Sequence, residues 1–153
     1  SANEIREGLK QTAWPGRLEV FEKDDARIVL DGAHNLAGVQ TLLHALDALY
    51  AEQSISLIFG VLGDKDFEAM ARVLFPRARA LFLTPVSNSR SLAPEHYEAL
   101  ARSLCAHVTL CSSSADALAK ARGIAGSEGL VVGAGSLHLI GELRALLVGS
   151  GIR

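Results

Sequence analysis

Five consecutive residues, Asp31-Gly32-Ala33-His34-Asn35, combine the types that a phosphorylated ligand needs. They stand between an apolar run and a helical pattern, where Gly32 permits a tight backbone and the first helical N–H groups can bind an anion. His34 can add a hydrogen bond or a positive charge, and Asp31 can accept from a sugar hydroxyl. The alternative is that Asp31 or Asn35 simply caps the helix. The combination of all five types favours the ligand site.

A second polar segment, residues 60–66, also follows an apolar run, and it reads Gly-Val-Leu-Gly-Asp-Lys-Asp. Lys65 could neutralise phosphate charge, and with Asp64 beside it the segment suits a loop next to a phosphate or a metal. The competing interpretation is a solvated turn in which Asp66 caps the next helix. On this segment alone, the two interpretations carry equal weight.

Two further segments suit a small carboxylate. Residues 84–95 hold Arg90 among small polar residues, and an arginine can clamp a carboxylate with two hydrogen bonds. Composition alone favours an ordinary surface loop there. Residues 133–136 read Gly-Ala-Gly-Ser and resemble the start of a dinucleotide fingerprint, but His138 stands where the third glycine belongs. We therefore reject a dinucleotide site and expect backbone N–H groups and Ser136 to suit a carboxylate.

Short apolar runs that predict strands alternate with helical patterns along the whole chain. A charged turn at residues 23–25 joins the first two runs and predicts a hairpin with one antiparallel strand. The later runs are apolar on both faces, which is typical of parallel strands covered by helices on both sides. The predicted strands are residues 18–22, 26–30, 56–60, 80–84, 107–111 and 130–133.

Helical periodicity fills the gaps between the predicted strands. Apolar positions recur at three- and four-residue spacing, Pro94 suits the first turn of its helix, and Ser113 or Ser114 can cap another. We predict an α/β, Rossmann-like three-layer sandwich: a mostly parallel sheet of about six strands with helices on both faces. Ligands bind such sheets beyond the carboxyl ends of the strands. The helical stripes lie within residues 39–50, 67–74, 97–104, 113–122 and 137–147.

Bulk properties exclude several other classes of protein. The 153 residues carry a net charge of −2 and no basic run, so we expect no nucleic-acid partner. The apolar runs are far short of a bilayer span, and no signal peptide precedes the first strand, so we expect no membrane partner and a cytoplasmic location. Cys105 and Cys111 fit reduced thiols. Residues 1–12 lack an initial methionine and read as a tail or linker, which suggests a piece of a longer polypeptide.

Four segments in this order resemble the C-terminal domain of the folylpolyglutamate synthase/dihydrofolate synthase family, within the Mur ligase superfamily. They are residues 14–19, 30–35, 60–66 and 133–144. The resemblance implies a ligase that uses ATP to join L-glutamate to folate or dihydropteroate through an acyl phosphate. It also implies that the phosphate loop and the Mg²⁺ ligands lie in the enzyme's own preceding N-terminal domain. Residues 1–12 would then be an interdomain linker remnant and residues 13–153 a single domain, inactive alone.

The resemblance also implies roles for individual residues. Arg17, Asp31, His34 and Asn35 would bind ATP, with Asp31 at the ribose hydroxyls. His34 would lie near the phosphates or the acyl phosphate and serve in catalysis. Ser136 would bind the incoming glutamate.

The remaining implied roles concern two loops. Asn88 and Arg90 loosely resemble an amino-acid motif of muramyl-tripeptide ligases and would bind a glutamate carboxylate. Lys65 and Asp64 would lie near phosphate, or would form an interdomain contact. The family usually has proline where Leu36 stands, and leucine is tolerated at that helical position. We expect a monomer. The alternatives are another Mur-type amino-acid ligase or a non-catalytic nucleotide-binding module.

Overall fold

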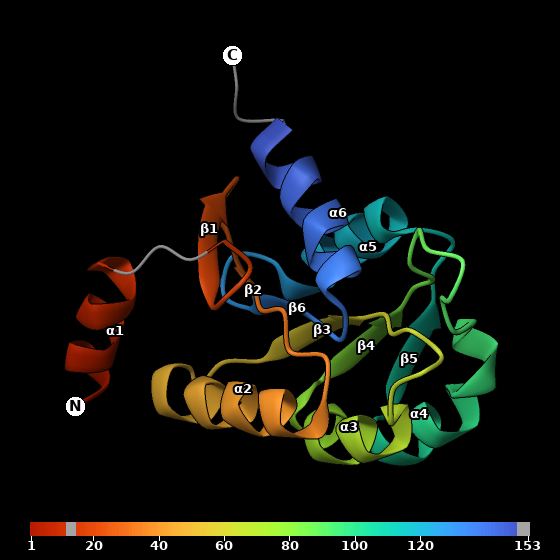
Figure 1. Ribbon diagram of the computed structural model, residues 1–153. Coiled ribbons are helices and arrows are strands. Elements are labelled where there is room, and N and C mark those ends of the chain that lie inside the picture. Colours follow the sequence, from red (N-terminus) through yellow and green to blue (C-terminus); the bar gives the residue numbers. More distant parts are fainter. Residues whose placement is uncertain (12–14, 150–153) are drawn as a thin grey trace.

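The computed structural model describes residues 1–11 and 15–149, and within them six strands form one sheet (Figure 1). Their order across the sheet is β1-β2-β6-β3-β4-β5. Strands β1 and β2 pair antiparallel, and every other neighbouring pair is parallel. The strands are β1 (Glu19–Lys23), β2 (Ala26–Leu30), β3 (Ile55–Phe59), β4 (Ala80–Leu83), β5 (His107–Leu110) and β6 (Leu130–Ala134).

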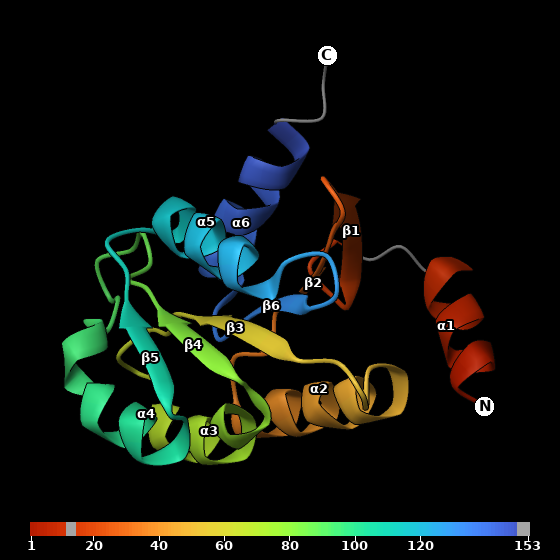
Figure 2. The same cartoon turned by 180° about the vertical axis from the view of Figure 1, so that it is seen from behind.

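Side chains that alternate along the strands separate into two apolar clusters, one on each face of the sheet. On one face, Leu57 and Val132 pack in the same cluster as Leu42 of α2 and Met70 of α3. Helices α2, α3 and α4 cover that face, and α5 and α6 cover the other (Figures 1 and 2). This arrangement confirms the predicted three-layer α/β sandwich. The helices are α2 (Leu36–Leu49), α3 (Phe67–Leu74), α4 (Glu98–Leu104), α5 (Ser114–Ala125) and α6 (Leu137–Gly149).

The predicted hairpin is confirmed at residues 23–25. Lys23 pairs with Ala26, so the loop has two residues, Asp24 and Asp25. Both have positive φ angles, 50° and 63°. Positive φ at both central residues is the geometry of the turn that matches the twist of a two-stranded ribbon, and Asp tolerates it better than most residues.

Pro94 does not begin an α-helix. It opens a 3₁₀ turn, η2 (Pro94–His96), and α4 begins only after Tyr97. The Tyr97 backbone leaves the helical region, with φ −125° and ψ 13°. Its ring is buried against Phe59 and Phe67, at centroid distances of 6.1 and 5.6 Å. The ring therefore joins the apolar core, as its place in the predicted stripe requires, although the helix is interrupted there.

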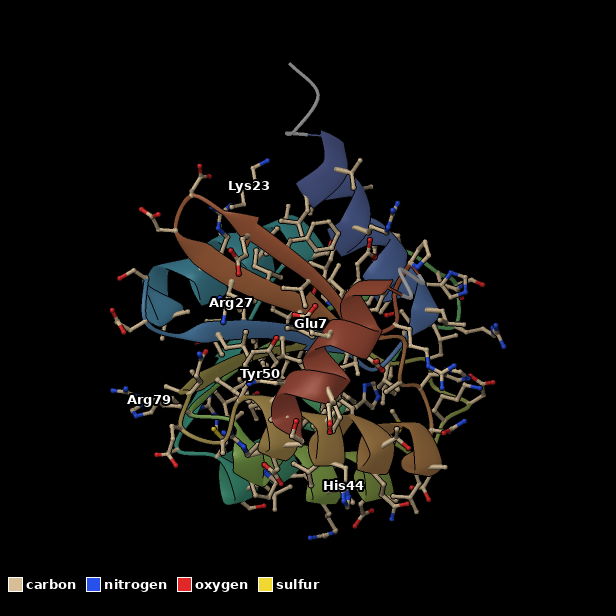
Figure 3. The ribbon with its side chains drawn as sticks, turned by 90° about the vertical axis from the view of Figure 1, so that its left-hand side faces the viewer. Glu7, Lys23, Arg27, His44, Tyr50 and Arg79 are labelled. Atoms are coloured by element: carbon tan, nitrogen blue, oxygen red, sulfur yellow. The ribbon has the colours of Figure 1, made fainter. Side chains whose placement is uncertain are left out.

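A helix, α1 (Ala2–Gln11), forms where the sequence suggests a tail or linker. Ser1 and Glu4 form a capping box, in which the Ser1 Oγ accepts the Glu4 N–H and the Glu4 carboxylate binds the Ser1 amino group. The helix contacts α2 at the side of the domain (Figure 3). A helix can also serve as a linker, so the linker role of residues 1–12 stays a prediction. Trp14, part of the first family-like segment, lies outside the described residues.

Candidate functional site

The polar segments predicted to bind ligands meet at one edge of the sheet. Because β2, β6, β3 and β4 are parallel neighbours, their carboxyl ends lie side by side. These four strands are followed by residues 31–35, 135–136, 60–66 and 84–92. This edge therefore holds all four polar segments, and their hydrogen bonds divide them into two groups.

The first group, here called the Asp31 corner, comprises residues 16–18, 31–35 and 135–137. Asp31 is half-buried, and its carboxylate accepts the N–H of Leu18 at 3.1 Å and of Ala33 at 2.9 Å. Gly32 N–H donates to the Gly16 carbonyl at 2.6 Å. The carboxylate thus fastens the loop of Arg17 to the end of β2, instead of capping α2.

Burial raises the pKa of the Asp31 carboxyl above its usual value of 3.8. The N–H groups of Ala33 and Leu18 and the positive charge of Arg17 oppose this shift. Arg17 itself is exposed. Burial makes the carboxylate costly to keep ionised, so a ligand that donates hydrogen bonds to it would stabilise its charged form.

The other two polar side chains of residues 31–35 have different partners. Asn35 caps α2: its Oδ1 accepts the Gly38 N–H at 2.8 Å, so the capping interpretation holds for this residue. Leu36 is the first residue of that helix. His34 Nδ1 donates to the Gly32 carbonyl at 2.8 Å, since a carbonyl can only accept. In the neutral ring this leaves Nε2 as an acceptor.

Ser136 closes the Asp31 corner from β6. Its Oγ accepts the His138 N–H at 3.1 Å and caps α6, and the residue is only 2% exposed. Because the cap uses a lone pair, the hydroxyl proton remains for another partner. Gly135 N–H donates to the Ala33 carbonyl at 2.9 Å. A Cβ on Gly135, whose φ is +116°, would lie 2.4 Å from the Gly60 carbonyl oxygen.

The second group, here called the Asn88 cluster, joins three predicted residues to one that the prediction missed. Arg90 forms an ion pair with Asp64 at 3.3 Å, and Gly63 N–H donates to the Arg90 carbonyl at 2.7 Å. Asn88 Oδ1 accepts the Arg90 N–H at 2.8 Å, and Asn88 Nδ2 lies 3.3 Å from His138 Nε2. In the sequence, His138 stands out only as the residue that breaks a glycine motif.

Glu142 is a second residue that the prediction missed. Its carboxylate accepts the Ser87 N–H at 3.3 Å, one residue before Asn88. His138 and Glu142 are four positions apart, so they share one face of α6, and this spacing was the available signal. Nearby, Asp66 caps α3 by accepting the Ala69 N–H at 3.2 Å, as the turn interpretation expects. Lys65, in the same loop as Asp66, is half-buried, and its neighbour Asp64 pairs with Arg90.

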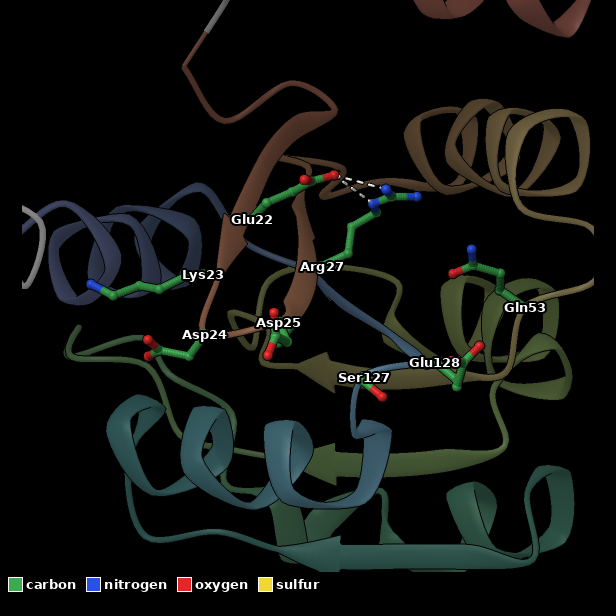
Figure 4. Close-up of a pocket in the computed structure, with 10 residues that line it drawn as sticks. Glu22, Lys23, Asp24, Asp25, Arg27, Gln53, Ser127 and Glu128 are labelled. Carbon is green, nitrogen blue, oxygen red and sulfur yellow. Dashed lines mark hydrogen bonds and ion pairs between the residues drawn. The ribbon is translucent and has the colours of Figure 1, made fainter.

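A separate hollow of about 520 Å³ lies at the opposite, amino edge of the sheet (Figure 4). It is lined by residues 22–27, Gln53 and residues 127–129. Two of its charged side chains form ion pairs: Arg27 with Glu22 at 2.7 Å within the hollow, and Asp24 with Arg122 of α5 at 2.9 Å. No predicted site residue lies there.

Two features are absent from the described residues: a cluster of metal ligands and a membrane-spanning helix. In residues 1–11 and 15–149, no three or more His, Cys, Asp or Glu side chains gather so that they could hold a metal ion. None of the helices within those same ranges is long and apolar enough to cross a membrane.

Comparison with known proteins gives a consistent set of relatives. Residues 16–137 match the family model of the Mur ligase, glutamate ligase domain. The chain is 38% identical over 146 residues to the folylpolyglutamate synthase of Lacticaseibacillus casei, covering 95% of this chain and 32% of that protein.

Solved structures agree with that relationship. The folylpolyglutamate synthase of Thermotoga maritima superimposes with a TM-score of 0.79 at 31% identity, over 100% of this chain and 35% of that one. The Mycobacterium tuberculosis folylpolyglutamate synthase complexed with ADP and AMPPCP gives a TM-score of 0.82 at 25% identity, over 96% and 35%. The chain therefore spans about a third of the length of these relatives.

Proposed function

The chain belongs to the Mur ligase family through its glutamate ligase domain, and from this premise we propose that it is the C-terminal domain of a longer ATP-dependent ligase. That ligase adds L-glutamate to folate or dihydropteroate. The fastening of Arg17 to the end of β2 by the half-buried Asp31 carboxylate carries the proposal. It places an arginine and a carboxylate beside the N-terminus of α2, where an anion is stabilised.

In this proposal residues 16–18 and 31–35 of the Asp31 corner bind the nucleotide. Asp31 accepts from the ribose hydroxyls, and the exposed Arg17 and the first N–H groups of α2 face the phosphates. Asn35 contributes by holding the start of that helix in place. The complex of the Mycobacterium tuberculosis relative with ADP and AMPPCP supports a nucleotide as the ligand.

The Asn88 cluster, with Ser136, binds the incoming glutamate. Arg90 and Asp64 are about half exposed, with side-chain exposures of 60% and 49%. An ion pair this exposed contributes little to stability, so a substrate carboxylate can replace Asp64 at low cost. The Ser136 hydroxyl, which keeps its proton while capping α6, can donate to the same substrate.

The proposed reaction has two steps. A pteroate or folate carboxylate oxygen attacks the γ-phosphorus of ATP, ADP leaves, and an acyl phosphate forms. The glutamate amine then attacks the acyl carbon, phosphate leaves with the bonding electron pair, and the nitrogen loses a proton. His34 would act at Nε2, as an acceptor when neutral and as a donor to phosphate oxygens when protonated.

Divalent metal chemistry is assigned to the rest of the enzyme. Following the family resemblance, we propose that the Mg²⁺ ligands, like the phosphate loop, lie in the preceding domain. Lys65 and Asp64 are then available for a contact with that domain or with phosphate. The cytoplasmic location and monomeric state predicted from the sequence stay predictions.

A ligation assay tests the proposal. The full-length protein should convert ATP, L-glutamate and dihydropteroate or folate to ADP, phosphate and the glutamylated product, whereas the isolated 153 residues should give none. Robust ligation by the isolated chain would refute the division between domains. A full-length protein that uses a different amino acid would support another Mur-type ligase, and one that binds nucleotide without turnover would support a binding module.

A further inference from the structure

The side chain of Asn88 is held at both ends. Its Oδ1 accepts the backbone N–H of Arg90 at 2.8 Å, and its Nδ2 lies 3.3 Å from Nε2 of His138 on α6. The Asn88 backbone N–H also donates to the Val86 carbonyl at 2.7 Å. Asn88 is therefore the link between the first turn of α6 and the loop that presents Arg90.

The contact at Asn88 Oδ1 determines which protonation state of the His138 ring is compatible with this geometry. An N–H can only donate, so Arg90 N–H identifies the Asn88 atom facing it as the carbonyl oxygen. The amide NH₂ then faces His138, and Nε2 must accept. A neutral ring with its proton on Nδ1 satisfies this requirement, whereas a protonated ring presents two donors to each other. Rotating the Asn88 side-chain amide by half a turn would present its oxygen to a protonated His138 ring. The same rotation would break the hydrogen bond from the Arg90 N–H.

Other contacts hold the same loop without depending on His138. Glu142 accepts the Ser87 N–H, Ser91 Oγ accepts the Val86 N–H at 2.9 Å, and Leu92 N–H donates to the Val61 carbonyl at 2.9 Å. Loss of the His138 contact should therefore shift Arg90 without unfolding the loop.

Charged groups lie on α6 and on the two loops of the Asn88 cluster. They are Glu142 on α6 and the paired Asp64 and Arg90 on the two loops. Because Asp64 and Glu142 are acids in this cluster, the His138 ring itself has to be observed in any test.

We propose that neutral His138 is a positioning residue for the amino-acid substrate. Its Nε2 holds Asn88, Asn88 holds the backbone of Arg90, and Arg90 meets the substrate carboxylate. Protonation of the ring releases this chain of contacts, so recognition of the amino acid weakens as the pH falls. The inference rests on the proposed function for its ligand, but the coupling from His138 to Arg90 is a property of this chain alone.

Nuclear magnetic resonance of the 153-residue chain tests the coupling. Over about pH 5 to 8, the Arg90 backbone amide and the Asn88 side-chain amide should shift with the same midpoint as the His138 ring nitrogens. His138→Gln should remove this inflection and keep the signals near their high-pH positions, because an amide oxygen accepts at every pH. His44→Gln, which replaces an exposed histidine on α2 (Figure 3), is the control and should leave the inflection in place. The proposal would be overturned if the Arg90 and Asn88 signals did not shift together with those of the His138 ring. It would also be overturned if the inflection were unchanged in His138→Gln.

Kinetics of the full-length ligase test the consequence for substrate. Loss of one neutral hydrogen bond should raise the glutamate KM roughly two- to tenfold, in His138→Leu at any pH and in the unmodified enzyme at low pH. His138→Gln should keep the low KM at both pH values, and the ATP KM should stay nearly unchanged in all of them. An equal rise in the ATP KM would overturn the positioning role.

A separate variant distinguishes failure of this inference from failure of the proposed function. If Arg90→Ala leaves the glutamate KM unchanged, Arg90 does not bind the amino acid, and the positioning role fails together with that part of the proposed function. If Arg90→Ala raises the glutamate KM while His138→Leu does not, only the inference about His138 fails.

Discussion

The Asp31 corner and the Asn88 cluster lie on the same edge of one sheet, but they are held in place by different forces. The Asp31 corner is joined by backbone hydrogen bonds and by a half-buried carboxylate that accepts two N–H groups. The Asn88 cluster adds contacts between exposed side chains, those of Arg90 with Asp64 and of Asn88 with His138. Backbone contacts in a packed corner open rarely, whereas exposed side-chain contacts exchange easily. We therefore expect the proposed nucleotide site to be fixed and the proposed amino-acid site to be adjustable.

The largest effect on stability is expected at Gly135, between the end of β6 and the start of α6. Gly135→Ala should lower the free energy of unfolding by roughly 2–4 kcal/mol, since it combines a strained φ with a clash. The Cβ would lie 2.4 Å from a backbone oxygen that cannot move independently. Urea denaturation measures the change.

Gly141→Ala on α6 is the matched control for that experiment. A Cβ there meets nothing within 4 Å, so alanine should raise stability by up to about 1 kcal/mol. Equal effects of the two substitutions would show that the strand-end corner is not rigid.

Arg17→Ala should give the largest effect on ligand binding. A charge-assisted contact contributes about 1.5–3 kcal/mol, so the ATP KM of the full-length ligase should rise roughly ten- to a hundredfold with little change for glutamate. Arg27→Ala removes an arginine at the amino edge, paired with Glu22, and should leave both KM values unchanged. If the glutamate KM rose more than the ATP KM, the roles assigned to the Asp31 corner and the Asn88 cluster would be reversed.

Ser136→Ala tests whether capping accounts for the whole role of this residue. Loss of the cap should cost about 1 kcal/mol of stability. Ser113→Ala removes the equivalent cap of α5, where Oγ accepts the Asp116 N–H at 3.1 Å, and should cost a similar amount. Only Ser136→Ala should also raise the glutamate KM more than the ATP KM. If the two variants behave alike in both assays, Ser136 is a cap and nothing more.

The smallest effect concerns the pH dependence of stability. Burial raises the folded-state pKa of Asp31 above its usual 3.8, so the folded protein holds this proton more tightly than the unfolded chain. The stabilisation is fully present below pH 3.8 and is lost as the pH rises through the folded pKa. Relative to Asp31→Asn, which does not titrate, the free energy of unfolding of the unmodified chain should therefore fall across this window. Denaturation at a series of acidic pH values measures it, and a rising difference would contradict the burial argument.

Much of the fold could be predicted because apolar periodicity is local. Each predicted strand overlaps an observed one, and the charged turn at residues 23–25 forms the expected hairpin. Tyr97 was predicted to lie on the apolar face of a helix and is buried, but the break in the helix at this residue was not predicted, because its ring contacts are tertiary and do not show in the local pattern. Helix α1 was missed although Ser1 and Glu4 carry a recognisable capping box.

The site was predicted less completely than the fold. Asp31 and Asn35 were predicted to lie in one segment, but the sequence does not show which of them caps the helix. The answer depends on a hydrogen bond from Leu18, thirteen residues away, to the Asp31 carboxylate. The contact of Asn88 with His138 spans fifty residues and depends on the order of β4, β3 and β6 in the sheet. The ligand roles of all these residues stay predictions.

The most direct test is a pair of titrations of the isotopically labelled chain, one with ATP and one with L-glutamate, followed by backbone amide shifts. The account predicts that ATP moves the amides of residues 16–18 and 31–35, that glutamate moves those of Asn88, Arg90 and Ser136, and that neither moves residues 22–27 at the amino edge. Shifts centred on residues 22–27, or the same residues responding to both ligands, would contradict the separation of a nucleotide site from an amino-acid site.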